Sequence, residues 1–442
     1  MKNKFAYFWF RRDLRVTDNN GLYQALISGY QVKPIFIFDT TILNRLTDKT
    51  DARLQFIYNQ ISILKDIFNG KSNDYPNLHS DIEVWHGNPI DVWKEILSSD
   101  EVAGVYTNAD YEPSAIERDA KIATLCQEFN CSFSSFKDQV VFEKSEVTKD
   151  DGLPYTVFTP YMRKWKARYI AHPPINYPSE NNLDKLANFT YGEMPSLKYL
   201  GFSPSPIEIP SSTVEQGRIK NYEQTRDIPS VLGTSRLSVH LRFGTISVRE
   251  KVSKGFKLSD KWVNELIWRE FYMQILYHFP RVLKESFKTQ YDRIEWINNE
   301  SDFEHWKAGT TGYPIVDAGM RELNTTGFMH NRVRMIVASF LTKHMLIDWR
   351  WGESYFADKL LDFELASNNG GWQWASGSGV DAAPYFRVFN PTLQTQKFDS
   401  EFKYIKQWVP EYGTKDYPQP IVEHSFARDR CLAVYKEALN RD

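Results

Sequence analysis

Residues 264–272, with the sequence NELIWREFY, combine acidic, basic and aromatic side chains at helical spacing. Residues three or four positions apart share one face of a helix, and four members of this segment do so: Glu265, Trp268, Arg269 and Tyr272. A carboxylate beside an indole on such a face can hydrogen-bond and stack against a nucleobase. An amphipathic helix with a core tryptophan and a surface Glu–Arg pair explains the same residues equally well.

Residues 233–241, with the sequence GTSRLSVHL, offer a second kind of chemistry. The glycine and the polar residues after it, Thr234, Ser235 and Arg236, supply backbone N–H groups, hydroxyls and a guanidinium. If the segment opens a helix, these groups can hold a phosphate or diphosphate. An ordinary capped helix start is the alternative interpretation.

Residues 364–374, with the sequence ELASNNGGWQW, mix residue types that rarely occur together. Asn and Gly are poor helix formers, whereas Trp is large and apolar. The pattern indicates a backbone brought close to a flat group, with aromatic walls beside it. A tight turn packed by two core tryptophans is the simpler interpretation.

The segment FMHNRVRMI places Asn331 and Met335 on one helix face. In the same segment, Arg334 could pair with a buried acid such as Asp362, and Arg332 could contact a phosphate.

His330, the only histidine in this segment, is more typical of a structural residue than of a metal ligand. No spacing of His, Cys and carboxylates predicts a metal site. The basic and aromatic segment 161–169 is usual for a solvated helix face, although nucleic-acid contact is possible for it. The chain has no G-x-S-x-G or Walker A motif, so hydrolase and P-loop functions lack support.

The elements that must position these residues fall into two groups. Strand-like and helix-like segments alternate over residues 1–135, which predicts a doubly wound parallel α/β sheet. The expected strands are 4–10, 32–39, 82–87 and 102–108, and helix 51–68 lies between two of them. No Gly-rich dinucleotide motif follows the first strand. Residues 136–215 are rich in Pro and Ser, which predicts a linker, and 216–442 is expected to be helical, with helices at 261–279, 313–326 and 330–347.

Composition is that of a folded multidomain protein. The chain has 442 residues, of which 42% are hydrophobic and 25% charged. The net charge of −2 does not by itself indicate a nucleic-acid partner, and three scattered cysteines do not predict a disulfide framework. Neither a secretory signal nor a membrane-spanning segment is present, so we expect a soluble cytoplasmic protein.

Taken together and in this order, the motifs resemble the photolyase/cryptochrome family, and within it the class I cyclobutane pyrimidine dimer (CPD) DNA photolyases of bacteria. The resemblance runs from FWFRRDLRVTDN at 8–19 to DYPQPIVEH at 416–424. It implies a Rossmann-like antenna domain, a long linker and a helical domain that binds FAD. It also implies a blue-light-driven enzyme, a deoxyribodipyrimidine photo-lyase, which transfers an electron from reduced FAD to a flipped dimer and takes it back after the ring splits.

The resemblance assigns roles to individual residues. Trp296, Trp349 and Trp372 would conduct electrons to the flavin, and Asn368 would face flavin N5. The catalytic set would be Glu265, Asn368 and Met335, and the DNA or lesion contacts would be Arg226, Glu265, Trp268, Asn331, Arg332, Trp374 and Gln394. The residues expected to bind FAD are Tyr222, Thr234, Ser235, Arg236, Leu237, Ser238, Trp262, Arg334, Asp362, Phe363, Glu364 and Asn368.

The sequence also distinguishes branches of the family. Asn331 and Met335 stand where (6-4) photolyases have histidines, which favours dimer repair. Glu364 stands where the family usually has Asp, which could shift a flavin contact. Ser114 and Ala115 replace an Asn-Glu pair of folate-binding members, so an antenna chromophore could be a folate, a deazaflavin, another flavin or absent. UV-damaged DNA is the expected partner of a monomer, and a non-repairing cryptochrome-type photoreceptor with FAD is the alternative function.

Overall fold

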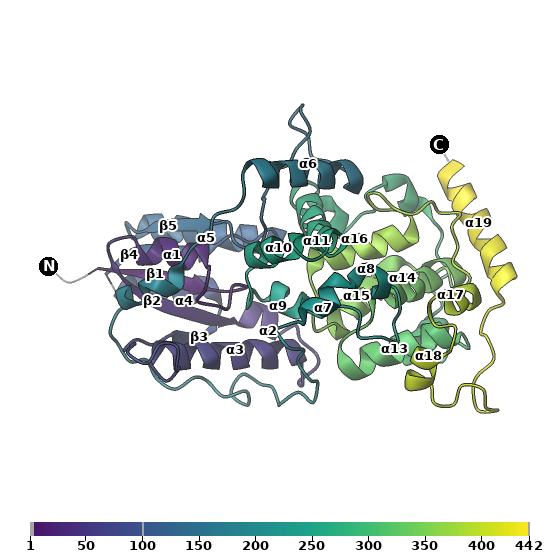
Figure 1. Cartoon of the computed structure of the whole chain (residues 1–442), viewed down its shortest axis with the longest axis horizontal. Helices are drawn as coiled ribbons and strands as arrows, with labels where there is room; N and C mark the ends of the chain where they lie inside the picture. The colour runs from purple at the N-terminus through teal and green to yellow at the C-terminus, as the bar shows by residue number, and fades with distance from the viewer. Residues whose placement is uncertain (1–3, 100, 441–442) are drawn as a thin grey trace. The chain divides into compact units, whose positions relative to one another are not determined.

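A computed structural model describes residues 4–99 and 101–440 (Figure 1). The chain divides into two compact units, each assembled from segments distant in sequence. The first unit comprises Met1–Glu146, Trp165–Ser212 and Leu237–Lys254, and the second comprises Val147–Lys164, Thr213–Arg236 and Gly255–Asp442. Residues 136–215, the expected linker, contain a helix of their own, α6 (Phe158–Ala171), and a short 3-10 helix, Ser179–Lys185.

The first unit is built on a five-stranded parallel sheet in the order β3-β2-β1-β4-β5. This confirms the predicted doubly wound α/β fold. Four strands match the expected ones closely, and the fifth was not predicted because three of the five residues in its sequence, SFSSF, are serine. The strands are β1 (Phe5–Phe10), β2 (Gln31–Asp39), β3 (Glu83–Gly87), β4 (Val102–Asn108) and β5 (Ser132–Phe136).

Alternate residues of the central strand β1 point to opposite faces of the sheet, and both sets are apolar. Helices therefore cover both faces. On one face, the rings of Tyr7 and Trp9 lie 5.8 and 5.7 Å from Trp93 of α4 (Pro89–Ser99). On the other face, Phe10 lies 6.1 Å from Phe68 at the end of α3 (Ala52–Phe68). Both faces are therefore apolar, as a doubly wound sheet requires.

A buried ion-pair network joins a late segment of the chain to this unit. Arg249 of α10 (Val248–Phe256) contacts Asp138 at 2.8 Å and Asp18 at 3.1 Å, and Arg15 contacts Asp138 at 2.8 Å. Burial alone would raise the pKa of Asp138, but the two guanidinium groups hold it below its usual value. The network keeps residues 237–254 with the sheet.

The second unit is helical, as predicted. Its main helices are α11 (Asp260–His278), α12 (Glu300–Ala308), α13 (Pro314–Thr326), α14 (Asn331–Ser339), α15 (Trp349–Lys359), α16 (Leu365–Ser376), α17 (Pro391–Phe398), α18 (Lys403–Trp408) and α19 (His424–Asn440). The single helix expected at 330–347 is wrong in its second half, where α14 passes into a short π-helix at Phe340–His344. There the Thr342 hydroxyl donates to the Ala338 carbonyl at 2.9 Å, at the point where the backbone hydrogen-bond pattern changes from that of an α-helix to that of a π-helix.

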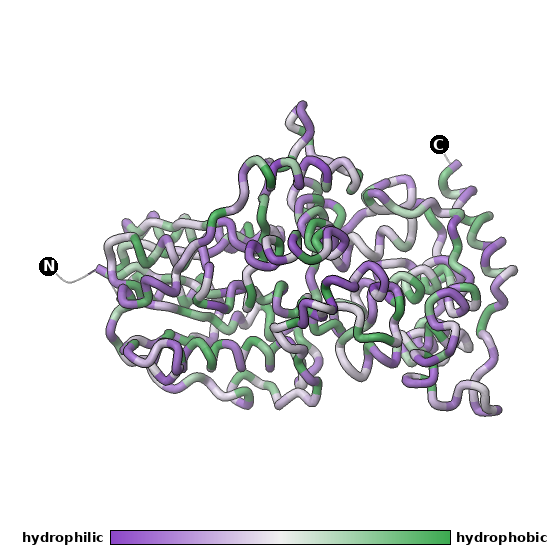
Figure 2. Tube along the Cα trace, in the orientation of Figure 1, coloured by the Kyte–Doolittle hydropathy of each residue, from purple (hydrophilic) through white to green (hydrophobic). Residues whose placement is uncertain are grey.

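Much of the tryptophan enrichment belongs to the core of this unit. Trp306, Trp349 and Trp372 are each at most 3% exposed and lie in one hydrophobic cluster. The Trp306 indole donates to the Val337 carbonyl at 3.1 Å, which satisfies its only polar group. Hydrophobic stretches along the helices are short and interrupted by hydrophilic residues (Figure 2), and within 4–99 and 101–440 no helix has the length and apolarity to cross a membrane.

A histidine pair of which one member, His344, is fully buried makes the stability of the second unit depend on pH. The rings of His344 and His424 are hydrogen-bonded at 2.9 Å, and burial, followed by His424 and Arg430, lowers the pKa of His344 from 6.5 to about 3. Between these values the unfolded chain binds a proton that the folded chain rejects, so acidification lowers the free energy of unfolding, by about 2 kcal/mol at pH 5. Thermal unfolding at pH 7 and pH 5 should show a smaller acid-induced loss for His344→Gln than for the wild type. Equal losses would contradict this prediction.

Candidate flavin and lesion site

The segment ELASNNGGWQW is not a tight turn but the greater part of helix α16. Glu364 caps this helix: its carboxylate accepts from the Ala366 N–H at 3.3 Å, and from the Ser367 N–H and hydroxyl at 2.9 and 2.8 Å. A glutamate reaches back over the first turn here as the shorter N-cap residues do. Tertiary contacts on several sides of α16 override its poor helix propensity.

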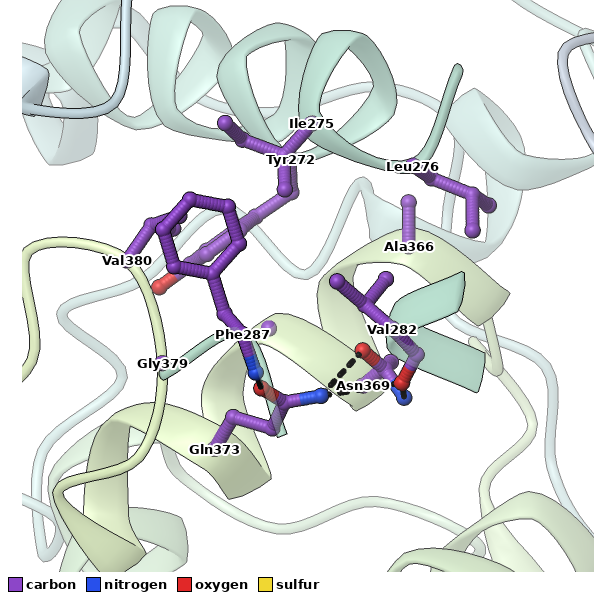
Figure 3. Close-up of a pocket in the computed structure, with 11 residues that line it drawn as sticks. Tyr272, Ile275, Leu276, Val282, Phe287, Ala366, Asn369, Gln373, Gly379 and Val380 are labelled. Carbon is purple, nitrogen blue, oxygen red and sulfur yellow. Dashed lines mark hydrogen bonds between the residues drawn. The ribbon is translucent and has the colours of Figure 1, made fainter. Parts of the chain in front are cut away.

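One side of α16 is tied to the loop after α11 by two amides (Figure 3). The Asn369 and Gln373 side chains both donate to the Val282 carbonyl, at 3.0 and 2.9 Å. The Gln373 side-chain carbonyl accepts from the Phe287 N–H at 2.8 Å. These residues are four apart, as one helix face requires, and they line a small pocket that contains none of the expected flavin or lesion residues.

The two glycines serve packing within the protein. A Cβ on Gly370 would lie 2.2 Å from the Tyr272 ring of α11, so this glycine lets α11 and α16 approach closely. Gly371 faces open space, with no heavy atom within 4 Å of a Cβ built on it. The expected close approach of this backbone to a flat group is therefore made by the protein's own Tyr272 ring at Gly370.

Asn368 and Trp372 occupy another side of α16. The buried Asn368 amide donates to the backbone carbonyl of Glu353 in α15 at 3.0 Å. One turn later, Trp372 packs under Gly352, where a Cβ would lie only 2.1 Å from the indole. Burial also raises the pKa of the Glu353 carboxyl. Helix α15 thus fixes the orientation of both expected site residues.

The predicted Arg334–Asp362 ion pair is present, with 3.0 Å between nitrogen and oxygen. Asp362 is nearly buried, and Arg334 also donates to the Met329 carbonyl at 2.7 Å. Phe363, the next residue, is partly buried against the hydrophobic cluster that contains Trp306, Trp349 and Trp372, which is called the main core cluster below. The segment 362–364 therefore leads directly from an ion pair into the cap of α16.

The loop of Thr234, Ser235 and Arg236 has free backbone donors. Among the described residues, no hydrogen-bond acceptor in the chain pairs with the three N–H groups, and Arg236 has a left-handed φ of 51°. The Trp262 indole of α11 donates to the Ser235 hydroxyl at 3.4 Å. Backbone N–H groups and hydroxyls in this arrangement suit a phosphate-bearing cofactor such as FAD. Leu237 is buried, while Ser238 is exposed and begins α9 (Ser238–Arg242), which belongs to the first unit.

A chain of ion pairs joins several expected lesion residues. The Glu265 carboxylate pairs with Arg226, which follows the short helix α8 (Tyr222–Thr225). Asp227 lies 3.8 Å from Arg226 and 2.8 Å from Arg332 of α14. Burial raises the pKa of Glu265, and Arg226 partly offsets this effect. Sequence reasoning missed Asp227; its place directly after Arg226 was the available signal.

Two further expected residues, Met335 and Tyr222, lie beside these charges. The Arg332 guanidinium lies 3.6 Å from the Met335 sulfur and 4.3 Å from the Phe398 ring centre of α17, the helix that also carries Gln394. Tyr222 is buried, with the Arg226 guanidinium 5.3 Å from its ring centre, whereas Asn331 is exposed.

Trp268 presents a flat ring supported from behind. It is partly exposed, and Phe158 stacks on it with 3.7 Å between ring centres and 7° between planes. Trp374 is also partly exposed and packs, like Met335, against the main core cluster.

The three tryptophans expected to carry electrons differ in depth. Trp372 and Trp349 are 3% and 2% exposed, whereas Trp296 is only partly buried. All three contact the same core cluster.

Comparisons with known proteins identify the family of the chain. Residues 6–179 match the family model described as DNA photolyase, and residues 262–415 match the FAD binding domain of DNA photolyase. Deoxyribodipyrimidine photo-lyases of Halobacterium salinarum and Escherichia coli are 36% and 35% identical to the chain, which they match over 98% and 97% of its length and 98% of their own. A class III photolyase structure from Agrobacterium tumefaciens has a TM-score of 0.87 at 31% identity, covering 100% of this chain and 99% of that one.

A second solved structure bears on the cofactors. An archaeal photolyase from Sulfolobus tokodaii, described with two FAD molecules, has a TM-score of 0.82 at 35% identity and covers 98% of this chain and 100% of its own. The chain therefore belongs to the DNA photolyase family. Its helical unit contains the FAD-binding domain of that family.

Proposed function

We propose that this protein is a deoxyribodipyrimidine photo-lyase that repairs cyclobutane pyrimidine dimers in DNA under blue light. The observation that carries the proposal is the convergence of Glu265, Arg226 and Arg332, through Asp227, beside a full-length match to enzymes of that name. Bound and reduced FAD supplies the electron that opens the dimer ring. Asn331 and Met335 are not proton donors, which favours this reaction over (6-4) repair.

The residues of the chain have distinct roles in this proposal. Thr234, Ser235 and Arg236 hold the cofactor phosphates through free N–H groups and hydroxyls. The Asn368 amide is held in one orientation by its bond to Glu353 and faces the flavin without supplying a strong acid. The other residues proposed to contact FAD are Tyr222, Leu237, Ser238, Trp262, Arg334, Asp362, Phe363 and Glu364.

On the DNA side, the rings of Trp268 and Trp374 flank the extruded dimer. Extrusion from the duplex requires a few kcal/mol, least for a damaged pair, and apolar rings recover part of that energy by stacking. Glu265 hydrogen-bonds the pyrimidines while Arg332 contacts the backbone, and Asn331, Met335 and Gln394 complete the contacts. In the free protein the Arg226–Glu265 pair keeps both charges partnered until DNA binds.

Electron supply is assigned to Trp372 and Trp349, which are both buried, and to Trp296, which is more exposed. Each indole can lose one electron, so three in series connect the protein surface with the flavin. Photoreduction of bound FAD in a Trp372→Phe variant at the wild-type rate would contradict this assignment.

The function is tested by repair in light and in darkness. Purified FAD-loaded protein should remove dimers from UV-irradiated oligonucleotides under blue light and leave them intact in the dark, while undamaged DNA serves as the binding control. Equal dimer loss in both conditions, or none in either, would overturn the proposal. Normal flavin photoreduction without preference for damaged DNA would instead indicate a cryptochrome-type photoreceptor.

A second, light-harvesting chromophore is a separate part of the proposal. The relative from Sulfolobus tokodaii is described with a second FAD as a light-harvesting cofactor. Release of chromophores from the purified protein by heat, followed by chromatography against folate, deazaflavin and FAD standards, identifies which one this chain carries. FAD in unit stoichiometry with no other chromophore would show that it has no antenna.

A further inference from the structure

We propose that His330 is a positioning residue for the lesion-binding helix α14, through a buried relay that runs from Tyr404 through Glu322 to His330. This inference rests on the proposed function, because Asn331, Arg332 and Met335 of α14 are assigned there to contacts with the damaged DNA. None of the three relay residues belongs to the flavin or DNA contacts described above.

The relay is continuous and closed to solvent. The Tyr404 hydroxyl of α18 donates to the Glu322 carboxylate of α13 at 2.6 Å. The same carboxylate oxygen accepts from the His330 N–H at 3.3 Å. Tyr404, Glu322 and His330 are 1%, 4% and 3% exposed, so water does not compete for these bonds. Two other helices thereby determine where His330 sits.

His330 in turn determines where α14 begins. It is the N-cap residue, and its Nδ1 accepts from the Arg332 N–H at 3.2 Å. An N-cap side chain that accepts from the second helical N–H satisfies a donor that the helix itself leaves free. Asn331 is the first residue of the helix and Arg332 the second, so the cap sets the position of both.

The cap requires a neutral ring with an unprotonated Nδ1. Burial, reinforced by Arg334, Arg332 and Arg236 against the opposing charge of Asp227, lowers the pKa of His330 to about 4. The proton therefore lies on Nε2, which has no hydrogen-bond partner within 4–99 and 101–440. The ring acts through the backbone of Arg332 and not as an acid or base.

Substituting His330 by asparagine or by alanine distinguishes the capping role of the side chain from its size. The carboxamide oxygen of asparagine caps helices well, whereas alanine cannot. Binding of the FAD-loaded protein to a dimer-containing oligonucleotide is measured in the dark. Loss of a cap is equivalent to roughly a fivefold change. We expect His330→Ala to bind about fivefold more weakly, and His330→Asn to bind nearly as the wild type does. Tyr404→Phe removes only the far end of the relay and should weaken binding by less. His305→Ala, on an exposed histidine of α12, is the control and should change nothing.

A second readout does not depend on DNA. Hydrogen exchange of the peptide covering 328–336 should be faster in His330→Ala and restored by His330→Asn. Unchanged exchange and binding in His330→Ala, or equal defects in the alanine and asparagine variants, would overturn the inference. If the wild type itself shows no preference for damaged DNA, the proposed function fails, and the exchange result alone then decides whether His330 positions α14.

Discussion

Replacing Trp268 with alanine is expected to weaken dark binding of dimer-containing DNA by about ten- to a hundredfold. Stacking of a base on an aromatic side chain contributes roughly 1–3 kcal/mol, and each 1.4 kcal/mol is a factor of ten in affinity. Trp268 is partly exposed, and Phe158 supports it from behind at 3.7 Å, so its outer face is held flat without a ligand. Titration of FAD-loaded protein with a fluorescent oligonucleotide measures the effect.

The matched variant is Trp268→Phe, which keeps a flat apolar ring against Phe158. It should retain most of the affinity, and both variants should bind undamaged DNA as the wild type does. If the alanine variant binds the dimer with unchanged affinity, Trp268 is a packing residue of α11 and the wall assigned to it must lie elsewhere.

Replacing Gly352 with alanine is expected to destabilise the protein by roughly 1–3 kcal/mol, the usual penalty for overpacking a core. Alanine normally favours a helix over glycine by about 1 kcal/mol. Here the new Cβ would lie 2.1 Å from the Trp372 ring and 2.6 Å from Leu341, both buried, so steric overlap decides the sign. Thermal unfolding measures the change, and slower photoreduction of bound FAD would report displacement of Trp372.

Gly371→Ala is the control for this substitution. It lies in α16 with no heavy atom within 4 Å of the added carbon, so only the helix propensity acts and the variant should be as stable as the wild type or more so. If Gly352→Ala were also stabilising, α15 and α16 would be packed less closely than described.

Sequence patterns predicted the sheet, the helical unit and the Arg334–Asp362 pair because each depends on local periodicity or on charge complementarity. They failed where distant contacts decide the local structure. Helix α16 forms despite its Asn-Asn-Gly-Gly run because Glu364 caps it and Val282 and Phe287 bind its amides. The short π-helix after α14 likewise could not be predicted from periodicity alone.

The candidate site shows the same division. Motif spacing placed Glu265 and Trp268 on one helix, but the link from Glu265 to Arg332 passes through Asp227, which no spacing rule singles out. His330 is bonded to Glu322, which is bonded in turn to Tyr404, so the sequence around position 330 contains no sign of this relay. For both Glu265 and His330, sequence reasoning identified the helix that carries the residue but not the contacts that hold its side chain in place.

Arg249 belongs to the sheet unit although it lies far beyond the last strand in the sequence, and this has a consequence for biosynthesis. Asp18 and Asp138 are almost fully buried, and Arg249 is a partner of both. A nascent chain that stops before this arginine leaves buried carboxylates short of positive charge, a strongly unfavourable state. The sheet unit therefore completes its fold only after residue 254 has left the ribosome, more than a hundred residues behind its last strand.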